Sequence, residues 1–322
     1  MEQNKLSDIN KWVKQFYTSG FSIEKASSDA SFRSYYRIIS QGETKILMDA
    51  PPKQEPIASF LDVTKRLAAA NLNVPIIYEK DELKGYILMS DLGTKNYLDA
   101  LNNETVYCLY TDAIDALCQI QNEVNCDKLK KFDMKEQLLE MRLFSDWFIN
   151  EHLKTKLSDD QDKLLEKCYI DIAETLLDIP QTFVHRDFHS RNLMITDKNN
   201  PGILDYQDAL IGPITYDLVS LLKDCYIKWD KELVNKMTKS CLSKLEKSIA
   251  YDEFKYWFDI TGLQRHLKAI GIFSRLCYRD NKSSYLKDIP RTFSYVDEIC
   301  SHYSELQPLQ KLIKEIKIEE KL

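Results

Sequence analysis

Features that mark several classes of protein are missing from this sequence. Its 8 cysteines form no C-x-x-C pair, and no histidine stands at zinc-ligand spacing from them, so neither a zinc site nor a redox motif is indicated and we expect reduced thiols. No stretch approaches the ~18 apolar residues of a membrane span, and the N-terminal residues contain no apolar signal-peptide region. We therefore expect a cytoplasmic protein with no membrane partner.

An excess of positive charge is also missing. The net charge is -6 and the isoelectric point is near 5.6, which argues against a nucleic-acid partner because a phosphate backbone favours clustered lysine and arginine. The 322 residues are 44% hydrophobic and 29% charged, as is ordinary for a globular protein. The chain is long enough for two lobes and a large core.

The most informative segment is the run from His185 to Asn192, which reads HRDFHSRN. Phosphoryl transfer to a hydroxyl needs a carboxylate that orients the hydroxyl and accepts its proton, and oxygen ligands that hold Mg²⁺ across the phosphates. Asp187 and Asn192 have the spacing of the kinase loop H-R-D-x-x-x-x-N, so we assign Asp187 as the base and Asn192 as a metal ligand. Asp205 follows an apolar run that predicts a buried strand, and we assign it as the second metal ligand. A turn that caps a helix could contain the loop pattern by chance, but three linked elements in this order favour the catalytic interpretation.

Residues 1–92 predict a small, β-rich, nucleotide-binding lobe. The expected elements are a helix over 4–18, strands near 21–25 and over 31–39 and 44–48, a helix over 59–70, and strands over 74–78 and 86–89. This order resembles the N-lobe of a kinase, so we expect an α+β, two-lobe, protein-kinase-like fold. Residues 90–93 interrupt the apolar pattern and predict a hinge, where Met89, Ser90 and Leu92 are candidates to contact the adenine of ATP.

Residues 93–322 predict a larger, mostly helical lobe for catalysis and substrate binding. Helices are expected over 97–122, 134–154, 158–177, 216–226, 230–247, 252–276, 291–306 and 308–319. The charged segment 311–322 is expected to be a solvated helix end.

The catalytic loop resembles that of the aminoglycoside phosphotransferase and choline kinase superfamily, which typically reads H-G-D-x-H-x-x-N. His189 matches the second histidine of that pattern. The later segment GPITYDL, residues 212–218, resembles the superfamily's G-D-P-x-x-D-L segment. The resemblance implies that Asp217 caps a helix and braces the backbone of the catalytic loop.

Most of the chain also resembles a narrower family, the bacterial kinases that phosphorylate the anomeric hydroxyl of N-acetylmuramate and N-acetylglucosamine. The resemblance rests on segments at residues 28–37, 48–52, 212–224 and 264–275. It implies transfer of a phosphate from ATP, with Mg²⁺, to carbon 1 of an amino sugar during recycling of cell-wall fragments. We expect a monomer whose partners are ATP and this small-molecule substrate.

The lysine that kinases place on the third strand, to bind the α- and β-phosphates, has no clear equivalent. Residues 46–49 read Ile-Leu-Met-Asp, and Lys45 comes too early unless the strand register shifts. Arg33 or Arg37, in or after the loop 28–31 that should cover the phosphates, is the candidate replacement, because a guanidinium binds phosphate as a fork. The alternative is that both arginines are exposed charges on a strand. This loop has no glycine, which predicts a less close approach of its backbone to phosphate.

Five polar residues are candidates to bind sugar hydroxyl groups, because they flank the metal-binding strand or lie on helices expected to line the lower cleft. They are Gln207, Asp208, Asp224, Arg265 and His266. Each has a simpler explanation, since polar residues on helices are usually just solvated and His266 could be a core histidine.

Two other functions fit part of the sequence. An aminoglycoside or choline-type kinase shares the catalytic loop, but an aminoglycoside pocket predicts a dense acidic lining after residue 207, where this chain has mixed charge. A catalytically inactive, kinase-like binding module is supported by the missing strand lysine. It is opposed by the intact Asp187, Asn192 and Asp205.

Overall fold

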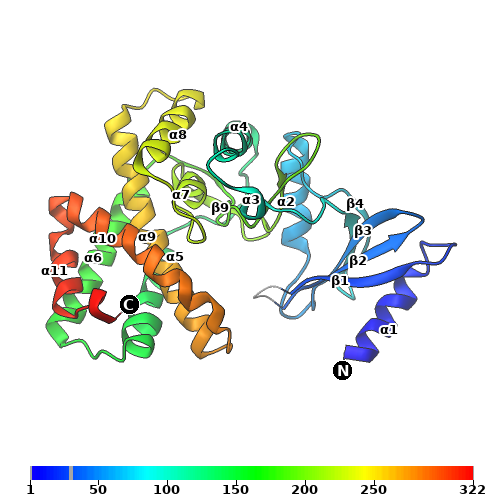
Figure 1. Cartoon of the computed structure of the whole chain (residues 1–322), viewed down its shortest axis with the longest axis horizontal. Helices are drawn as coiled ribbons and strands as arrows, with labels where there is room; N and C mark the ends of the chain where they lie inside the picture. Colours follow the sequence, from blue (N-terminus) through cyan, green and yellow to red (C-terminus); the bar gives the residue numbers. More distant parts are fainter. Residues whose placement is uncertain (1, 29–31, 322) are drawn as a thin grey trace.

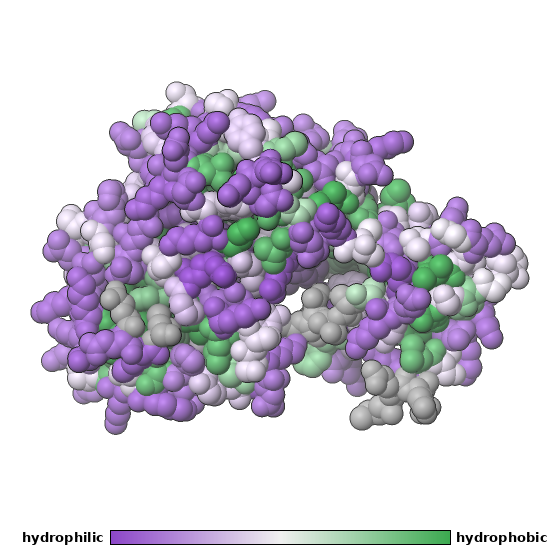
Figure 2. All heavy atoms as spheres, viewed as in Figure 1, coloured by the Kyte–Doolittle hydropathy of each residue, from purple (hydrophilic) through white to green (hydrophobic). Residues whose placement is uncertain are grey.

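The computed structural model describes residues 2–28 and 32–321 and contains two lobes (Figure 1). A β-sheet and its helices form the smaller lobe on the right of the view, and helices form most of the larger lobe on the left. The space-filling view shows a hollow where the two lobes meet (Figure 2). Among the described residues, no helix combines the length and the apolar character that crossing a membrane requires.

The smaller lobe contains a five-stranded antiparallel sheet with the order β1-β2-β3-β5-β4. Its elements are helix α1 (Glu2–Val13), strands β1 (Ser22–Ser28), β2 (Ser34–Ser40) and β3 (Glu43–Asp49), helix α2 (Ala58–Ala69), and strands β4 (Ile77–Asp81) and β5 (Tyr86–Ser90). The predicted order of strands and helix is confirmed. The predicted hairpin has its turn at Gln41 and Gly42. Their φ angles of 52° and 83° suit a two-residue hairpin loop, which needs a positive φ at both positions.

The two faces of this sheet have different partners. Leu47 packs with α1 on one face, whereas Met48 belongs to the main core on the other. Because side chains alternate along a strand, Lys45 shares the face of Leu47, and its Nζ lies 4.4 Å from the centre of the Tyr78 ring. Strand β3 therefore presents Ile46 and Met48, and not Lys45, on the face that belongs to the main core.

The larger lobe is built from helices around a second, extensive part of the core. They are α3 (Tyr97–Ala100), α4 (Val106–Glu123), α5 (Met134–Leu143), the π-helix η1 (Phe144–His152), α6 (Asp159–Asp178), α7 (Tyr216–Leu222), α8 (Lys231–Lys244), α9 (Tyr251–Tyr278), α10 (Ile289–His302) and α11 (Gln307–Glu315), with short 3₁₀ helices η2 (Ser283–Asp288), η3 (Ser304–Leu306) and η4 (Glu319–Lys321). Each predicted helix corresponds to one or two of these elements.

The differences from prediction have local causes. The helix expected over 97–122 is interrupted where the side chain of Asn102 accepts hydrogen bonds from nearby backbone N–H groups and so competes with the helix. The helix expected over 134–154 continues from α5 into the π-helix. The C-terminal segment is more than a solvated helix end, because Leu312 and Ile318 are buried.

Two short two-stranded sheets position the catalytic loop. Strand β6 (Gln181–Val184) pairs with β9 (Leu210–Pro213), and β7 (Leu193–Met194) pairs with β8 (Gly202–Ile203). The loop connects β6 to β7. Because Leu193 pairs with Ile203, Asn192 and Asp205 lie at the same end of the β7–β8 pair. The antiparallel register thus brings the two predicted metal ligands together.

Helix α9, with 28 residues, crosses the larger lobe and contacts α5, α7, α10 and η1 (Figure 1). Gly271 lies against the backbone of Leu143, where a Cβ atom would clash. This close approach fixes the rotation of α9 relative to α5 and therefore decides which of its side chains face the catalytic loop.

Candidate active site

The structure brings Asp187, Asn192 and Asp205 together. The Nδ2 atom of Asn192 donates hydrogen bonds to the backbone oxygen of Asp187, at 3.0 Å, and to Oδ2 of Asp205, at 3.3 Å. Both bonds are donated by the amide nitrogen, so the amide oxygen of Asn192, the atom that would bind a metal ion, takes no part in them.

Asp217, in the first turn of α7, holds the backbone of the catalytic loop. Its carboxylate oxygens accept hydrogen bonds from the backbone N–H groups of His185, at 2.7 Å, and Arg186, at 3.0 Å. Burial raises the pKa of Asp217 to about 7, although the two N–H donors act in the opposite direction. The predicted brace is confirmed, whereas the predicted helix cap is wrong, because Thr215 occupies the N-cap position of α7.

Arg186 adopts an unusual backbone conformation beside the candidate base. Its φ of 78° lies in the region that favours glycine, and the superfamily pattern H-G-D has glycine at this position. A non-glycine residue there costs about 1–2 kcal/mol. The hydrogen bond to Asp217 and an ion pair between the Arg186 side chain and Glu140 hold this conformation in place.

Asp187 is ionised in this environment. Burial alone would raise the pKa of its carboxyl group, but the positive charges of Lys268, Arg265 and Arg186 lower it to about 2. The carboxylate is therefore ready to accept a hydrogen bond from a substrate hydroxyl at neutral pH.

Asn192 and Asp205 form a donor set that suits a divalent cation. Gln207 Nε2 donates a hydrogen bond to Oδ1 of Asp205 at 2.7 Å and orients this carboxylate. Mg²⁺ prefers oxygen ligands and is commonly bound by one or two protein groups together with phosphate oxygens. The residues present fit that description. Within residues 2–28 and 32–321, no three His, Cys, Asp or Glu side chains gather as a metal site.

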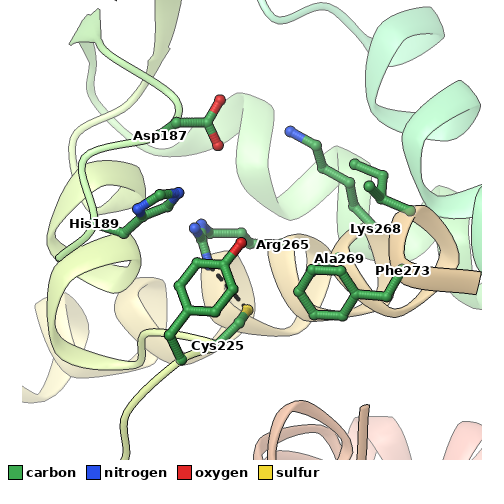
Figure 3. Close-up of a pocket in the computed structure, with 9 residues that line it drawn as sticks. Asp187, His189, Cys225, Arg265, Lys268, Ala269 and Phe273 are labelled. Atoms are coloured by element: carbon green, nitrogen blue, oxygen red, sulfur yellow. Dashed lines mark hydrogen bonds between the residues drawn. The ribbon is translucent and has the colours of Figure 1, made fainter. Parts of the chain in front are cut away.

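A pocket with an empty volume of about 450 Å³ lies beside Asp187. Figure 3 shows the polar ends of Asp187, His189, Arg265 and Lys268 directed toward one shared space, with the Phe273 ring along its side. Charged and apolar groups therefore meet in one cavity. This is the composition expected of a site for a small polar molecule with an apolar face.

Five of the residues that line the pocket come from one face of α9. They are Arg265, Lys268, Ala269, Ile272 and Phe273. Their spacing of i, i+3, i+4, i+7 and i+8 is that of a single helical face. Lys268 was not among the candidates from the sequence, although its helical spacing from Arg265 was a signal that could have identified it.

Lys268 belongs to a buried network around Glu140 of α5. Its Nζ lies 3.1 Å from Oε1 of Glu140 and 3.2 Å from the Tyr216 hydroxyl. Glu140 also pairs with Arg186 and accepts a hydrogen bond from Gln264 at 3.0 Å. Burial acts to raise the pKa of Glu140, but Lys268 and Arg186 outweigh it and lower that pKa, so the carboxylate stays charged.

The predicted substrate residues have separate locations. Arg265 lines the pocket, whereas Gln207 contacts Asp205 and Asp208 is exposed. The location of Asp208 gives no support to a substrate role, because this carboxylate is exposed and lies outside the pocket lining.

Asp224 and His266 also lie outside the pocket lining and have structural partners. Asp224 accepts hydrogen bonds from the backbone N–H of Ser190, at 3.0 Å, and from its hydroxyl, at 2.5 Å, and so braces the catalytic loop. The ring of His266 hydrogen-bonds through Nε2 to the backbone oxygen of Lys223 at 2.9 Å and stacks on Tyr295. These contacts explain both buried residues without a substrate.

The two candidate phosphate-binding arginines each have a carboxylate partner. Arg37 binds Asp91 with Nε at 2.6 Å and Nη2 at 3.1 Å, and its Nη2 also donates to the backbone oxygen of Gly93 at 3.1 Å. Arg33 Nη2 lies 2.6 Å from Oε2 of Glu55. Arg37 therefore ties strand β2 to the predicted hinge.

The hinge residues lie at the end of β5. Met89 is buried, and the Ser90 hydroxyl accepts a hydrogen bond from the backbone N–H of Ile76 at 2.9 Å. Leu92 lies next to Gly202 of β8, because a Cβ atom added to Gly202 would lie 3.0 Å from Cδ1 of Leu92. This contact places the hinge beside the strand that leads to Asp205.

Residues 22–240 match the model of the phosphotransferase enzyme family. The chain belongs to this family. It is 38% identical over 300 residues to an N-acetylmuramate/N-acetylglucosamine kinase of Pseudomonas putida, covering 92% of this chain and 88% of the relative. A kinase of the same name from Neisseria meningitidis is 38% identical over 325 residues, with 98% and 96% coverage.

Solved structures with the same fold include an ADP-bound aminoglycoside phosphotransferase and a choline kinase from Streptococcus pneumoniae. The first has a TM-score of 0.62 and 16% identity, and covers 91% of this chain and 98% of its own. The second has a TM-score of 0.65 and 11% identity, with 91% and 99% coverage. They confirm the predicted α+β, two-lobe, protein-kinase-like fold, and at these identities they show the fold alone.

Proposed function

We propose that this phosphotransferase transfers the γ-phosphoryl group of ATP to the anomeric hydroxyl of N-acetylmuramate or N-acetylglucosamine, in the recycling of cell-wall fragments. The observation that carries the proposal is the pocket beside Asp187, which combines hydrogen-bonding side chains with the Phe273 ring, as a sugar with polar edges and an apolar face requires. The names of the relatives that are 38% identical over nearly the whole chain support the same substrate.

Asp187 would orient the anomeric hydroxyl and accept its proton. The sugar oxygen forms a bond to the γ-phosphorus, the bond between that phosphorus and the β–γ bridging oxygen breaks, and ADP leaves with its electron pair. With a pKa of about 2, Asp187 is a weak base. Its main contribution is to orient the hydroxyl, and the acidity of an anomeric hydroxyl, above that of an ordinary alcohol, makes only a modest demand on the base.

Asn192 and Asp205 would hold Mg²⁺, which supplies charge neutralisation across the phosphates. Gln207 keeps the carboxylate of Asp205 oriented. The adenine would lie against the hinge residues Met89, Ser90 and Leu92. Either Arg33 or Arg37 would bind the phosphates, sharing its guanidinium with its present carboxylate partner.

The pocket composition argues against an aminoglycoside as the natural acceptor. A polycationic ligand needs an acidic lining, but Asp187 is accompanied here by Arg265 and Lys268. A monomeric state and a cytoplasmic location stay predictions from the sequence.

The test is to incubate the purified protein with Mg-ATP and, separately, N-acetylmuramate, N-acetylglucosamine, choline and kanamycin, and to locate the phosphate by ³¹P NMR. We expect an anomeric phosphate with one or both amino sugars. Asp187→Asn is the inactive control, and Asp208→Asn, which changes an exposed residue, is the matched active control. Phosphorylation of choline or kanamycin alone, or no transfer to any acceptor, would overturn the proposal.

A further inference from the structure

We infer that Arg265 forms a subsite for an acidic substituent of the acceptor sugar, so that the enzyme selects an amino sugar with a carboxylate over its neutral counterpart. The inference rests on the proposed function and deepens it. It concerns the choice between N-acetylmuramate, whose lactyl ether carries a carboxylate, and N-acetylglucosamine, which has a hydroxyl at the same position.

The charge of Arg265 has no ion-pair partner among the described residues. Its side chain lies in the pocket lining with only 5% exposure, and Nη1 contacts Sγ of Cys225 at 3.6 Å. Burial raises the pKa of the Cys225 thiol, so this partner is neutral. Burying a charge is costly unless an opposite charge and hydrogen bonds compensate for it. A neutral sulfur supplies only a weak acceptor for one of five N–H donors.

Other cations of the larger lobe that are buried or partly buried differ from Arg265 in this respect. Lys268 and Arg186 both pair with Glu140, and Lys223 lies 2.9 Å from Oδ1 of Asp259. Each of these cations thus has a carboxylate of the protein within ion-pair distance. The carboxylates of Asp187 and Asp224 act on the charge of Arg265 only from beyond that distance. Its guanidinium can therefore still form a direct ion pair with an anion from outside, and its position in the pocket makes a ligand the available source.

The position of Arg265 favours the acceptor as that ligand. Figure 3 shows Arg265 below Asp187, and it shares the pocket lining with Cys225, Tyr226 and Phe273. The candidate metal ligands, which would mark the phosphate side, are absent from that lining. A sugar with its anomeric hydroxyl at Asp187 would therefore place a ring substituent, and not the transferred phosphate, near the guanidinium. A carboxylate suits this position because a guanidinium binds it through two parallel hydrogen bonds.

The experiment compares kcat/KM for the two sugars in the parental enzyme and in Arg265→Met. We expect a loss of about 10- to 100-fold with N-acetylmuramate, mainly through KM, because a charge-assisted hydrogen bond to the carboxylate is removed. The loss with N-acetylglucosamine should be several-fold smaller, because that sugar has no carboxylate to lose, and any loss common to both sugars cancels in the ratio of their kcat/KM values. Arg265→Lys keeps the charge without the fork and should recover part of the loss. Arg275→Met, on the same helix but outside the pocket lining, is the matched control and should change neither sugar.

A second measurement needs no variant. The methyl ester of N-acetylmuramate adds one methyl group to the acceptor and removes its charge, so its kcat/KM with the parental enzyme should fall by a similar factor. If Arg265→Met does not fold, the ester comparison together with Arg265→Lys decides the question. Equal losses for both sugars would assign Arg265 to the phosphoryl group or to Asp187, and equal rates for the acid and its ester would also refute the subsite. A parental enzyme that phosphorylates neither sugar refutes the proposed function instead, which is a distinct outcome.

Discussion

Glu140 is a buried carboxylate, and removing its charge should lower both the stability and the activity of this protein. It is 7% exposed and compensates two cations near the catalytic loop, Arg186 and Lys268, while Gln264 donates a third contact at 3.0 Å. Glu140→Gln keeps the size of the side chain but removes its charge. Two partly buried cations would then share one neutral amide.

Removing one partner of a buried ion pair costs about 3–5 kcal/mol, because the remaining charge is uncompensated. The Arg186 side chain keeps 19% exposure and the Lys268 side chain 11%, so water can solvate both in part. We therefore expect the lower end of that range, a loss of about 3 kcal/mol in the free energy of unfolding. Activity should also fall, because Arg186 adjoins Asp187 and Lys268 lines the same pocket.

The assay is urea unfolding at neutral pH, with kcat/KM measured on the same preparations. Glu136→Gln is the matched control on the same helix, since Glu136 forms a more exposed ion pair with Lys130 and should cost less than about 1 kcal/mol. Adding Lys268→Met to Glu140→Gln should cost less than the sum of the two single changes. If Glu140→Gln destabilised the fold no more than Glu136→Gln does, the reasoning about the buried charge network would be wrong.

Four further predictions follow from the site and the core. Asp187→Asn should lower turnover by a factor on the order of 10² or more with folding nearly intact, and turnover within a few-fold of the parent would remove Asp187 from the mechanism. Asp205→Ala should weaken the use of Mg-ATP, and an unchanged metal dependence of the rate would reassign Asp205 as structural. Arg33→Lys and Arg37→Lys should behave unequally, because one of them should lower kcat/KM for ATP by an amount equivalent to about 1.5 to 3 kcal/mol. Negligible effects of both substitutions would mean that another cation binds the phosphates. Burial holds the pKa of His266 well below its ordinary value, so below about pH 6.5 the unfolded chain binds a proton that the folded chain does not. The free energy of unfolding should therefore fall by up to ~1.4 kcal/mol per pH unit as the pH decreases. Urea titrations between pH 7 and pH 5 should show a smaller slope for His266→Gln.

Local patterns were sufficient for the catalytic loop and for most helices and strands. The spacing from Asp187 to Asn192 is a property of one short loop, and the hairpin at Gln41 and Gly42 depends on turn residues next to each other in the chain. Helical periodicity also identified α9, and with it Arg265. These features could be predicted because neighbours in sequence determine them.

The rest of the pocket was decided by packing between distant segments. Glu140 and Lys268 are 128 positions apart, and their ion pair follows from how α5 and α9 pack, which periodicity alone does not specify. The same packing turns His266 into the core while Arg265, one position earlier, lines the pocket. Adjacent residues on a helix point about 100° apart, so only the tertiary contacts of α9 determine which of them meets the substrate and which meets the core.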